Sequence, residues 1–268
     1  MGGDDIDDDF LIENVVGSPL SDDDEDDELQ EILEQPDAAS GRKRKLSDAD
    51  RTLETTKSSD KKPPGKVLIE AGKYLNEQSI ENQSQFLETL LRHHALRSKN
   101  DAGNTADMEN VSQYLSKSDK SSLVDRIKDS VSMKKLKKWK TVRSPSIVVI
   151  CVSARRAVSV LKEVSPLKAR AAKLFPKNGD MKSQLEQLSS APFGVAVGTP
   201  HRLHVLCEQG SKGLSFEYTQ LIVVDCHMTN KDFTVCTLPD TAPDFATLLQ
   251  EFVLPSLQKR KDMRLAFF

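Results

Sequence analysis

The sequence contains no long hydrophobic run. No apolar stretch approaches the roughly 18 residues that a membrane-spanning helix needs, and residues 1–30 lack the basic start and apolar core of a secretory signal peptide. Charged residues make up 29% of the 268 residues and apolar residues only 37%, a balance too polar for the whole chain to be compact. We therefore expect neither secretion nor membrane insertion, and a chain that is partly disordered.

Cysteine is scarce and shows no paired spacing such as C-x-x-C. The chain has Cys151, Cys207, Cys226 and Cys236. Most of them lie in or beside apolar runs, which is typical of reduced, buried thiols in an intracellular protein. His201, His204 and Cys207 recur every three residues, but no tight ligand pair anchors a zinc site among them. The sequence therefore predicts no metal and no cofactor.

Basic residues are absent from the first 40 positions, which hold 16 acidic residues. The remaining 228 residues carry 25 acidic and 38 basic side chains, an excess of 13 positive charges. A basic body behind an acidic tail indicates an anionic partner, nucleic acid before membrane, with the tail competing for the same surface. Plain solvated charge on a soluble protein is the alternative.

Residues 1–62 nowhere gather enough apolar side chains to offset chain entropy, so we expect a disordered tail. Four consecutive bases, Arg42, Lys43, Arg44 and Lys45, form a cluster of the nuclear-import kind within it. Ser21 precedes four acidic residues, a setting in which acid-directed kinases phosphorylate serine. A solvated linker and an unmodified acidic tail are the respective alternatives.

Residues 63–144 are expected to form a helical segment. Apolar residues at 67–94 follow a loose helical period that predicts one or two helices. Residues 98–107 are predicted to be a loop, and a second helical region is predicted at about 107–138.

That second region ends in a basic stretch. Its bases are Lys134, Lys135, Lys137, Lys138, Lys140 and Arg143. Met133, Leu136 and Trp139 recur every three residues within it. Such a stretch can lie along a phosphate backbone with its stems packed on the domain. An amphipathic surface helix without a ligand is the alternative.

Residues 145–268 differ from the preceding segments in their sequence pattern. Continuous apolar runs rich in β-branched residues alternate there with helical segments. The predicted strands are Ser146–Val152, Phe193–Val197, Gln220–Val224 and Met263–Phe268. The predicted helices are Ala154–Glu163, Met181–Ser189, Pro200–Glu208 and Asp244–Gln258. This alternation predicts an α/β domain with right-handed βαβ units, a parallel sheet buried on both faces, and ligands at the carboxyl ends of the strands.

The end of the second predicted strand carries a turn suited to phosphate. Thr199 is placed to cap the next helix, Pro200 suits its first turn, and Gly198 lets the chain bend closely. The free amides of that turn then point the same way as Arg202, and together they predict a phosphate site. A well-formed turn with nothing bound is the alternative.

These residues carry a resemblance to a known family. Gly198–Leu203 resembles the Thr-Pro-Gly-Arg-Leu motif of DEAD-box RNA helicases, with His201 in place of a glycine. Ser153–Ala157 follows a strand as the family's Pro-Thr-Arg-Glu-Leu-Ala does, and Leu221–Asp225 is similar to the strand that ends in the Asp-Glu-Ala-Asp box. Arg264–Phe268 is similar to the strand leading to the Ser-Ala-Thr motif. The resemblance implies an incomplete RecA-like (P-loop-type) sheet flanked by helices.

The departures from the family are as informative, because phosphoryl transfer needs a phosphate-binding loop and acidic residues around Mg²⁺ and water. No G-x-x-x-x-G-K-[ST] occurs, and the chain stops before the Ser-Ala-Thr triplet and before any second lobe. Asp225 keeps the first acid of the box, but Cys226 and His227 follow it. We therefore expect a degenerate DEAD box, no catalytic residues and no ATP hydrolysis. A Cys226, His227 and Asp225 nucleophile is disfavoured, because neighbours at a strand end point to different sides.

An acidic tail, a basic segment and a truncated helicase-like domain together resemble the Cms family, described as ribosomal small-subunit homologues associated with pre-ribosomal complexes. The resemblance implies a non-catalytic protein of the nucleus and nucleolus that acts in small-subunit biogenesis, with pre-ribosomal RNA and pre-ribosomal proteins as partners. Arg155, Thr199, Pro200 and Arg202 match the RNA-contacting helicase motifs. The alignment leaves Arg155 and Arg156 to share one assignment.

Two other classes of function stay open at this point. The acidic tail can instead bind basic proteins, with the folded domain as a scaffold that touches no RNA. The third hypothesis is an active ATPase.

Overall fold

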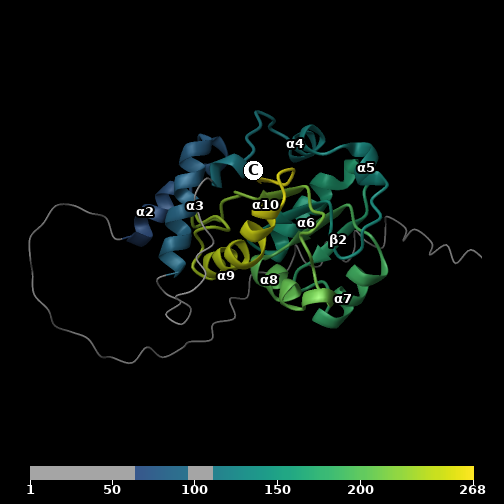
Figure 1. Cartoon of the computed structure of the whole chain (residues 1–268). Helices are drawn as coiled ribbons and strands as arrows, with labels where there is room; N and C mark the ends of the chain where they lie inside the picture. Colours follow the sequence, from purple (N-terminus) through teal and green to yellow (C-terminus); the bar gives the residue numbers. More distant parts are fainter. Residues whose placement is uncertain (1–63, 96–110) are drawn as a thin grey trace, which may run out of the picture. The chain divides into compact units, whose positions relative to one another are not determined.

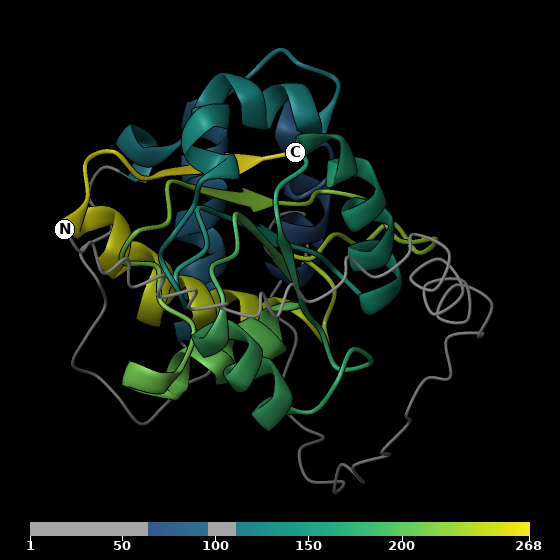
Figure 2. The same ribbon diagram turned by 90° about the vertical axis from the view of Figure 1, so that its right-hand side faces the viewer.

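The computed structural model of the chain describes residues 64–95 and 111–268. The predicted acidic and basic tail at 1–62 and the predicted loop at 98–107 lie outside the described residues. Within the part described, five parallel strands form one sheet in the order β2-β3-β1-β4-β5 (Figure 2). The strands are β1 (Ile147–Ile150), β2 (Ala171–Leu174), β3 (Val195–Gly198), β4 (Leu221–Val224) and β5 (Arg264–Phe267). The prediction of a parallel α/β sheet is confirmed.

The central strands form because β-branched side chains fill both faces of the sheet. Every residue of β1, Ile-Val-Val-Ile, is buried, and successive side chains point to opposite faces. The predicted runs at β1, β3, β4 and β5 are all confirmed. The sequence prediction missed β2, whose Ala-Ala-Lys-Leu lacks β-branched residues and alternates half-buried with buried positions. It is an edge strand that pairs with β3 alone, so it needs a weaker hydrophobic signal.

Helices cover both faces of the sheet (Figure 1). Val148 and Ile150 of β1 share a core cluster with residues of α3, α7, α8, α9 and α10. The side chains that alternate with them, Ile147 and Val149, are equally buried and face the other side, where α6 and α4 pack. The helices are α2 (Pro64–Ala71), α3 (Ile80–Ala95), α4 (Leu123–Ser130), α5 (Met133–Lys137), α6 (Ala154–Val164), α7 (Met181–Ser190), α8 (Pro200–Glu208), α9 (Ala242–Leu248) and α10 (Leu254–Lys259).

The helix predicted at 244–258 is interrupted. A π-helical turn, Leu249–Val253, separates α9 from α10, and Pro255 lies in the first turn of α10. Proline has no N–H to donate to the carbonyl four residues earlier, and its ring would collide with that carbonyl. The wider π turn accommodates this defect within an otherwise continuous helical segment.

The region predicted to be helical at 107–138 is correct only in part. Its described residues form the short 3₁₀ turn Val111–Tyr114 and the separate helices α4 and α5. Between the 3₁₀ turn and α4, Leu115 forms a parallel bridge with Leu265 of β5, and the N–H of Ser116 donates to the Leu265 carbonyl at 2.8 Å. A serine-rich stretch follows at 116–122, whose side chains compete with helical hydrogen bonding. The chain therefore covers the outer edge of β5 instead of continuing as helix.

A buried arginine attaches this covering segment, residues 115–122, and α4 to the sheet. Arg126 of α4 is 2% exposed; its guanidinium donates to the Phe267 carbonyl and, at 3.3 Å, to the Ser116 carbonyl. It also lies over the Phe268 ring, 5.9 Å from the centroid. Carbonyls of the strand end and of the covering segment are thus satisfied by one side chain.

We predict that Gly198→Ala destabilises the protein. A Cβ at Gly198 would lie 2.5 Å from the Leu174 carbonyl oxygen and 2.8 Å from Leu203 Cδ2, and overpacking of this kind costs about 1–3 kcal/mol. Urea denaturation monitored by circular dichroism measures the change. Gly65→Ala is the matched control, since nothing lies within 4 Å of its added Cβ and alanine favours helix over glycine. Equal stability of the two variants would contradict the packing argument.

Candidate nucleic-acid interface

The parallel sheet brings three of the predicted segments to one edge. Ile150, Gly198 and Val224, the last residues of β1, β3 and β4, are aligned in register. Arg155 and Arg156 follow β1, Thr199 to Arg202 follow β3, and Asp225 follows β4. We call this end of the sheet, where the strands terminate, the carboxyl edge. It is distinct from the two sides of the sheet formed by the edge strands β2 and β5.

A bidentate ion pair crosses the carboxyl edge. Arg156 Nε donates to Asp225 Oδ2 at 2.8 Å, and Nη2 donates to Oδ1 at 3.0 Å. Arg156 Nη1 donates to Glu163 Oε1 at 2.6 Å. The Arg156 and Asp225 side chains are 16% and 3% exposed. Burial lowers the pKa of Arg156, but the hydrogen bonds and charges of Asp225 and Glu163 outweigh it and leave the pKa raised.

Cys226 and His227 follow Asp225 at the end of β4. Cys226 is buried, and burial raises its pKa to about 12, so its thiol is neutral near neutral pH. Its N–H donates to the Phe268 carbonyl. His227 is exposed. The Asp225 carboxylate is already paired with Arg156. This strand end therefore carries an ion pair, a neutral thiol and a solvated imidazole.

The turn from β3 into α8 forms largely as expected, with one correction. Thr199 is the N-cap residue and Pro200 lies in the first turn, but the Thr199 side chain makes no capping hydrogen bond. The Thr199 carbonyl accepts the first hydrogen bond of the helix, from Leu203 N–H at 3.0 Å, and the Thr199 N–H donates to the Leu174 carbonyl at 3.3 Å. The cap side chain therefore leaves the N–H groups of the first turn unoccupied, as an anion site requires.

Arg202 connects α8 to the loop after β2. Its Nη1 donates to Gln184 Oε1 at 3.1 Å and to the Gly179 carbonyl at 3.3 Å. Gln184 is buried and donates to carbonyls of that loop, including Phe175 at 3.1 Å. Arg202 is half-buried. Its hydrogen bonds to Gln184 and Gly179 therefore hold the guanidinium in one place at the surface. Arg155 is half-buried in the first turn of α6.

The basic stretch lies at the opposite end of the sheet. Leu136 of α5 is buried beside Gly194, which directly precedes β3. Trp139 Nε1 donates to the carbonyl of Ser144, just before β1, at 2.9 Å, and Arg143 N–H donates to the Leu188 carbonyl at 2.9 Å. We call this end the amino edge. The exposed lysines there are Lys134, Lys135, Lys137, Lys138 and Lys140, and Arg143 is half-buried. The structure therefore does not bring the basic stretch and the Thr199–Arg202 turn into one surface.

The sequence prediction missed other bases at the amino edge. Lys168 and Arg170, both exposed, precede β2. Lys259 and Lys261, also exposed, precede β5. Lys168 and Arg170 were missed because β2 was not recognised. Basic residues directly before a recognised strand would have been placed at the amino edge. The predicted import cluster, Arg42 to Lys45, and the predicted phosphorylation site, Ser21, lie outside the described residues.

No group of three or more metal-ligating side chains is found among residues 64–95 and 111–268. The histidines of α8 contact acids instead: His201 Nδ1 lies 3.4 Å from Asp244 Oδ2, and His204 Nε2 lies 2.9 Å from Glu251 Oε2. In the same part of the chain, no helix is both long and apolar enough to cross a membrane.

A family model described as "CMS1: U3-containing 90S pre-ribosomal complex subunit" matches residues 31–268. The chain belongs to the Cms family. This confirms the resemblance to the Cms family noted in the sequence, and the matched region includes the whole sheet and both edges.

Curated members of the Cms family match over shorter stretches. Protein CMS1 of Chaetomium thermophilum is 30% identical over 131 residues, which are 47% of this chain and 51% of the relative. Protein CMSS1 of Homo sapiens is 27% identical over 129 residues, 47% of this chain and 45% of the relative. Protein CMSS1 of Danio rerio is 26% identical over 116 residues, 42% and 39% of the two chains. The matches thus span about half or less of each relative's length.

We predict that Asp225→Asn destabilises this Cms protein by about 3 kcal/mol, because it leaves the half-buried Arg156 guanidinium without its buried anionic partner. Urea denaturation measures the loss. Glu163→Gln is the matched control: it removes the other acid that pairs with Arg156, but that side chain is 39% exposed, so the expected loss is below about 1 kcal/mol. Equal losses from the two substitutions would show that the Asp225 pair has no special weight.

We also predict that all four cysteines, which are buried, resist alkylation in the folded protein. Burial raises the pKa of Cys226 to about 12, and it raises the pKa of the other three thiols as well. Because only the thiolate reacts, iodoacetamide at pH 8 should modify native protein at least about 100-fold more slowly than protein in guanidinium chloride. Mass spectrometry of time points measures the rates. A cysteine that reacts equally fast in both states would be accessible in the native fold.

Proposed function

We propose that the chain is a non-catalytic, RNA-associated factor of small ribosomal subunit biogenesis. The observation that carries the non-catalytic part is the buried Arg156–Asp225 ion pair at the end of β4. Membership of a family described as a subunit of the U3-containing 90S pre-ribosomal complex supports the role in ribosome assembly.

The proposal includes a helicase-like origin for the sheet, supported by the placement of its motif-like segments. Segments resembling three helicase motifs follow β1, β3 and β4 and meet at the carboxyl edge. Phosphoryl transfer there would need a carboxylate available to Mg²⁺ or water. Asp225 instead gives both oxygens to Arg156, and Cys226 is a neutral thiol. This geometry favours binding at the edge over hydrolysis.

We propose that RNA phosphates contact the carboxyl edge at the first turn of α8 and at neighbouring cations. Thr199, Pro200 and Arg202 supply a helix start whose amides receive no side-chain cap, a favourable site for an anion. Arg155 lies in the first turn of α6 near the same edge. Arg156 belongs to this edge too, but its guanidinium is bound to two carboxylates, so it positions α6 on the sheet.

The lysines of the basic stretch, Lys134 to Lys140, provide a second set of proposed phosphate contacts at the amino edge. Their side chains are exposed while Leu136 anchors α5, so charge is presented on a fixed segment. Pre-ribosomal RNA and pre-ribosomal proteins are the proposed partners, and the nucleus and nucleolus the proposed location. Import by Arg42 to Lys45 and phosphorylation at Ser21 are parts of the same proposal.

A second candidate function is a scaffold for basic proteins. The observation that favours it is the acidic composition of residues 1–40, which hold 16 acids and no lysine or arginine. Deleting these residues would then abolish recovery of basic ribosomal proteins, and no RNA would crosslink to the folded domain.

We predict that ultraviolet crosslinking in cells recovers pre-ribosomal RNA on the full-length protein, with crosslinked peptides at 134–143 or 199–202. Substituting Arg155→Ala and Arg202→Ala together should lower the recovered RNA several-fold, because two cations leave the carboxyl edge. Lys66→Ala with Lys231→Ala is the matched control, since both lysines are exposed and neither belongs to the residues proposed to contact RNA. Thermal unfolding checks that each variant is folded. RNA recovery no higher than that of an unrelated nuclear protein would favour the scaffold.

A further inference from the structure

We propose that the amino edge is a binding surface for single-stranded RNA, with a pocket beside Tyr218 that accepts one unstacked base. This inference rests on the proposed function, because it assumes that the protein contacts RNA, and it deepens that function by naming the class of RNA and the site. It concerns the end of the sheet opposite to the helicase-like segments.

Hydrogen bonds join the elements of the amino edge into one continuous strip. Trp139 Nε1 donates to the carbonyl of Ser144, and Ser144 Oγ accepts from the N–H of Tyr218 at 2.9 Å. The N–H of Ser215 donates to the Arg143 carbonyl at 2.8 Å. The strip thus runs from the lysines of α5, past Trp139, to the loop 214–219 that precedes β4.

The strip continues across the start of β5. Arg260 Nη1 donates to the carbonyls of Glu217 at 2.6 Å and Thr219 at 3.1 Å. This places the end of α10 against the loop before β4. At the other end of the strip, the Arg170 guanidinium lies 5.0 Å from the centroid of the Phe193 ring, next to the start of β3. Because neighbouring strands are about 4.8 Å apart, the strip spans the width of the five-stranded sheet, about 19 Å.

The charge on this strip is predominantly positive and exposed. Its exposed cations are Lys134, Lys135, Lys137, Lys138, Lys140, Lys168, Arg170, Lys212, Lys259 and Lys261. Of the nearby acids, Asp262 is paired with Arg260. Glu217, the acid beside the pocket, is exposed. Such a surface fits a polyanion, and its length matches several nucleotides of an extended strand.

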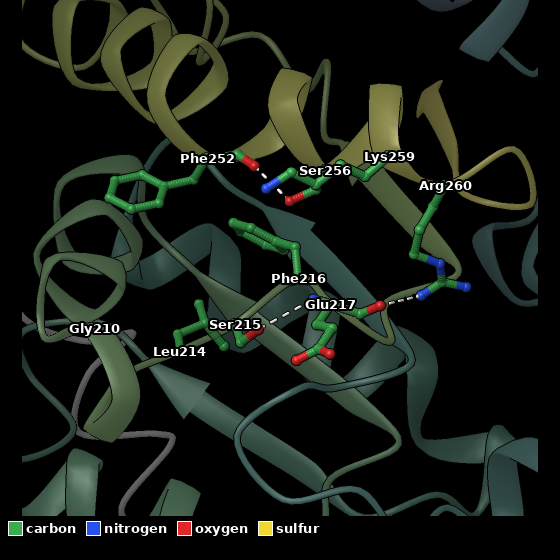
Figure 3. Close-up of a pocket in the computed structure, with 9 residues that line it drawn as sticks. All are labelled: Gly210, Leu214, Ser215, Phe216, Glu217, Phe252, Ser256, Lys259 and Arg260. Atoms are coloured by element: carbon green, nitrogen blue, oxygen red, sulfur yellow. Dashed lines mark hydrogen bonds between the residues drawn. The ribbon is translucent and has the colours of Figure 1, made fainter.

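A pocket opens on the strip between the loop 214–217 and α10 (Figure 3). Its volume is about 400 Å³, within the range of small-ligand sites. The lining residues are Gly210, Leu214, Ser215, Phe216, Glu217, Phe252, Ser256, Lys259 and Arg260. Phe216 and Phe252 give it an apolar wall, while Lys259 supplies positive charge at its side and Arg260 is already paired with Asp262. An apolar cavity with a cation beside it suits a planar base that carries a phosphate.

Two further features favour a base of single-stranded RNA over a duplex. Tyr218 follows the pocket loop and is 49% exposed, a large aromatic side chain available for stacking at the basic surface. The Glu217 carboxylate can accept hydrogen bonds from the amino or ring N–H groups of a base. A duplex keeps its bases stacked and paired, so neither the pocket nor Glu217 could reach them.

The test uses the full-length protein and fluorescence anisotropy with a labelled 12-nucleotide RNA of mixed sequence, single-stranded or annealed to its complement. We expect Tyr218→Ala with Lys259→Ala to weaken single-strand binding about tenfold, the scale of one lost base stack. Duplex binding should change less than twofold. Lys66→Ala with Lys231→Ala is the matched two-substitution control and should leave both affinities unchanged. Thermal unfolding confirms that the variants are folded.

The substitution Glu217→Gln distinguishes a hydrogen bond from Glu217 to a base from a purely electrostatic effect of its carboxylate. If Glu217 accepts a base N–H, the substitution alters the preference among single-stranded homopolymers. If Glu217 is only a repelling charge, the substitution tightens binding to every RNA alike, which would overturn the base pocket. Equal losses for single strand and duplex in the Tyr218 and Lys259 variant would overturn it as well.

Absence of RNA binding by the unmodified protein would defeat the RNA part of the proposed function itself. Binding that depends on Lys134 to Lys140 but not on Tyr218 or Lys259 would defeat this inference alone.

Discussion

The ion pair between Arg156 and Asp225 is the interaction on which the carboxyl edge depends. It joins the first turn of α6 to the end of β4, two elements that are 69 residues apart in sequence. A buried carboxylate is tolerated only when it is paired and hydrogen-bonded, and here both of its oxygens accept from one planar guanidinium. The pair therefore ties α6 to the end of β4, and both oxygens of the carboxylate are engaged in holding the fold.

The two edges of the sheet differ because a parallel arrangement sorts the ends of its helices. Helix starts follow the strands at the carboxyl edge and present N–H groups with partial positive charge. Helix ends precede the strands at the amino edge, where partial negative charge favours cations such as Lys259 in the last turn of α10. Lysines thus stabilise the fold at the same edge where they are exposed to solvent. The layout places backbone amides at one end of the sheet and side-chain charge at the other.

Sequence reasoning located the strands whose signal is strong and failed where the signal depends on tertiary contacts. Ile147–Ile150 and Leu221–Val224 are buried on both faces, so their composition alone predicts them. β2 pairs on one side only, and its alanines carry little strand preference. The cover over β5 was mistaken for helix because its bridge from Leu115 to Leu265 is between residues 150 positions apart. No local pattern reports such a pairing.

The same limit explains what was foreseen of the candidate site. Placing Arg155, Thr199 and Asp225 after parallel strands was sufficient to predict that they share an edge, because topology alone fixes that. It could not tell that Arg156 would pair with Asp225, since the two adjacent arginines differ only in which way the first turn of α6 directs them. It also could not separate the lysines at 134–140 from the Thr199 turn, because the path of the chain before β1 depends on where Leu136 and Trp139 pack. Side-chain direction and chain path, rather than residue type, decide which of these cations can act on one ligand.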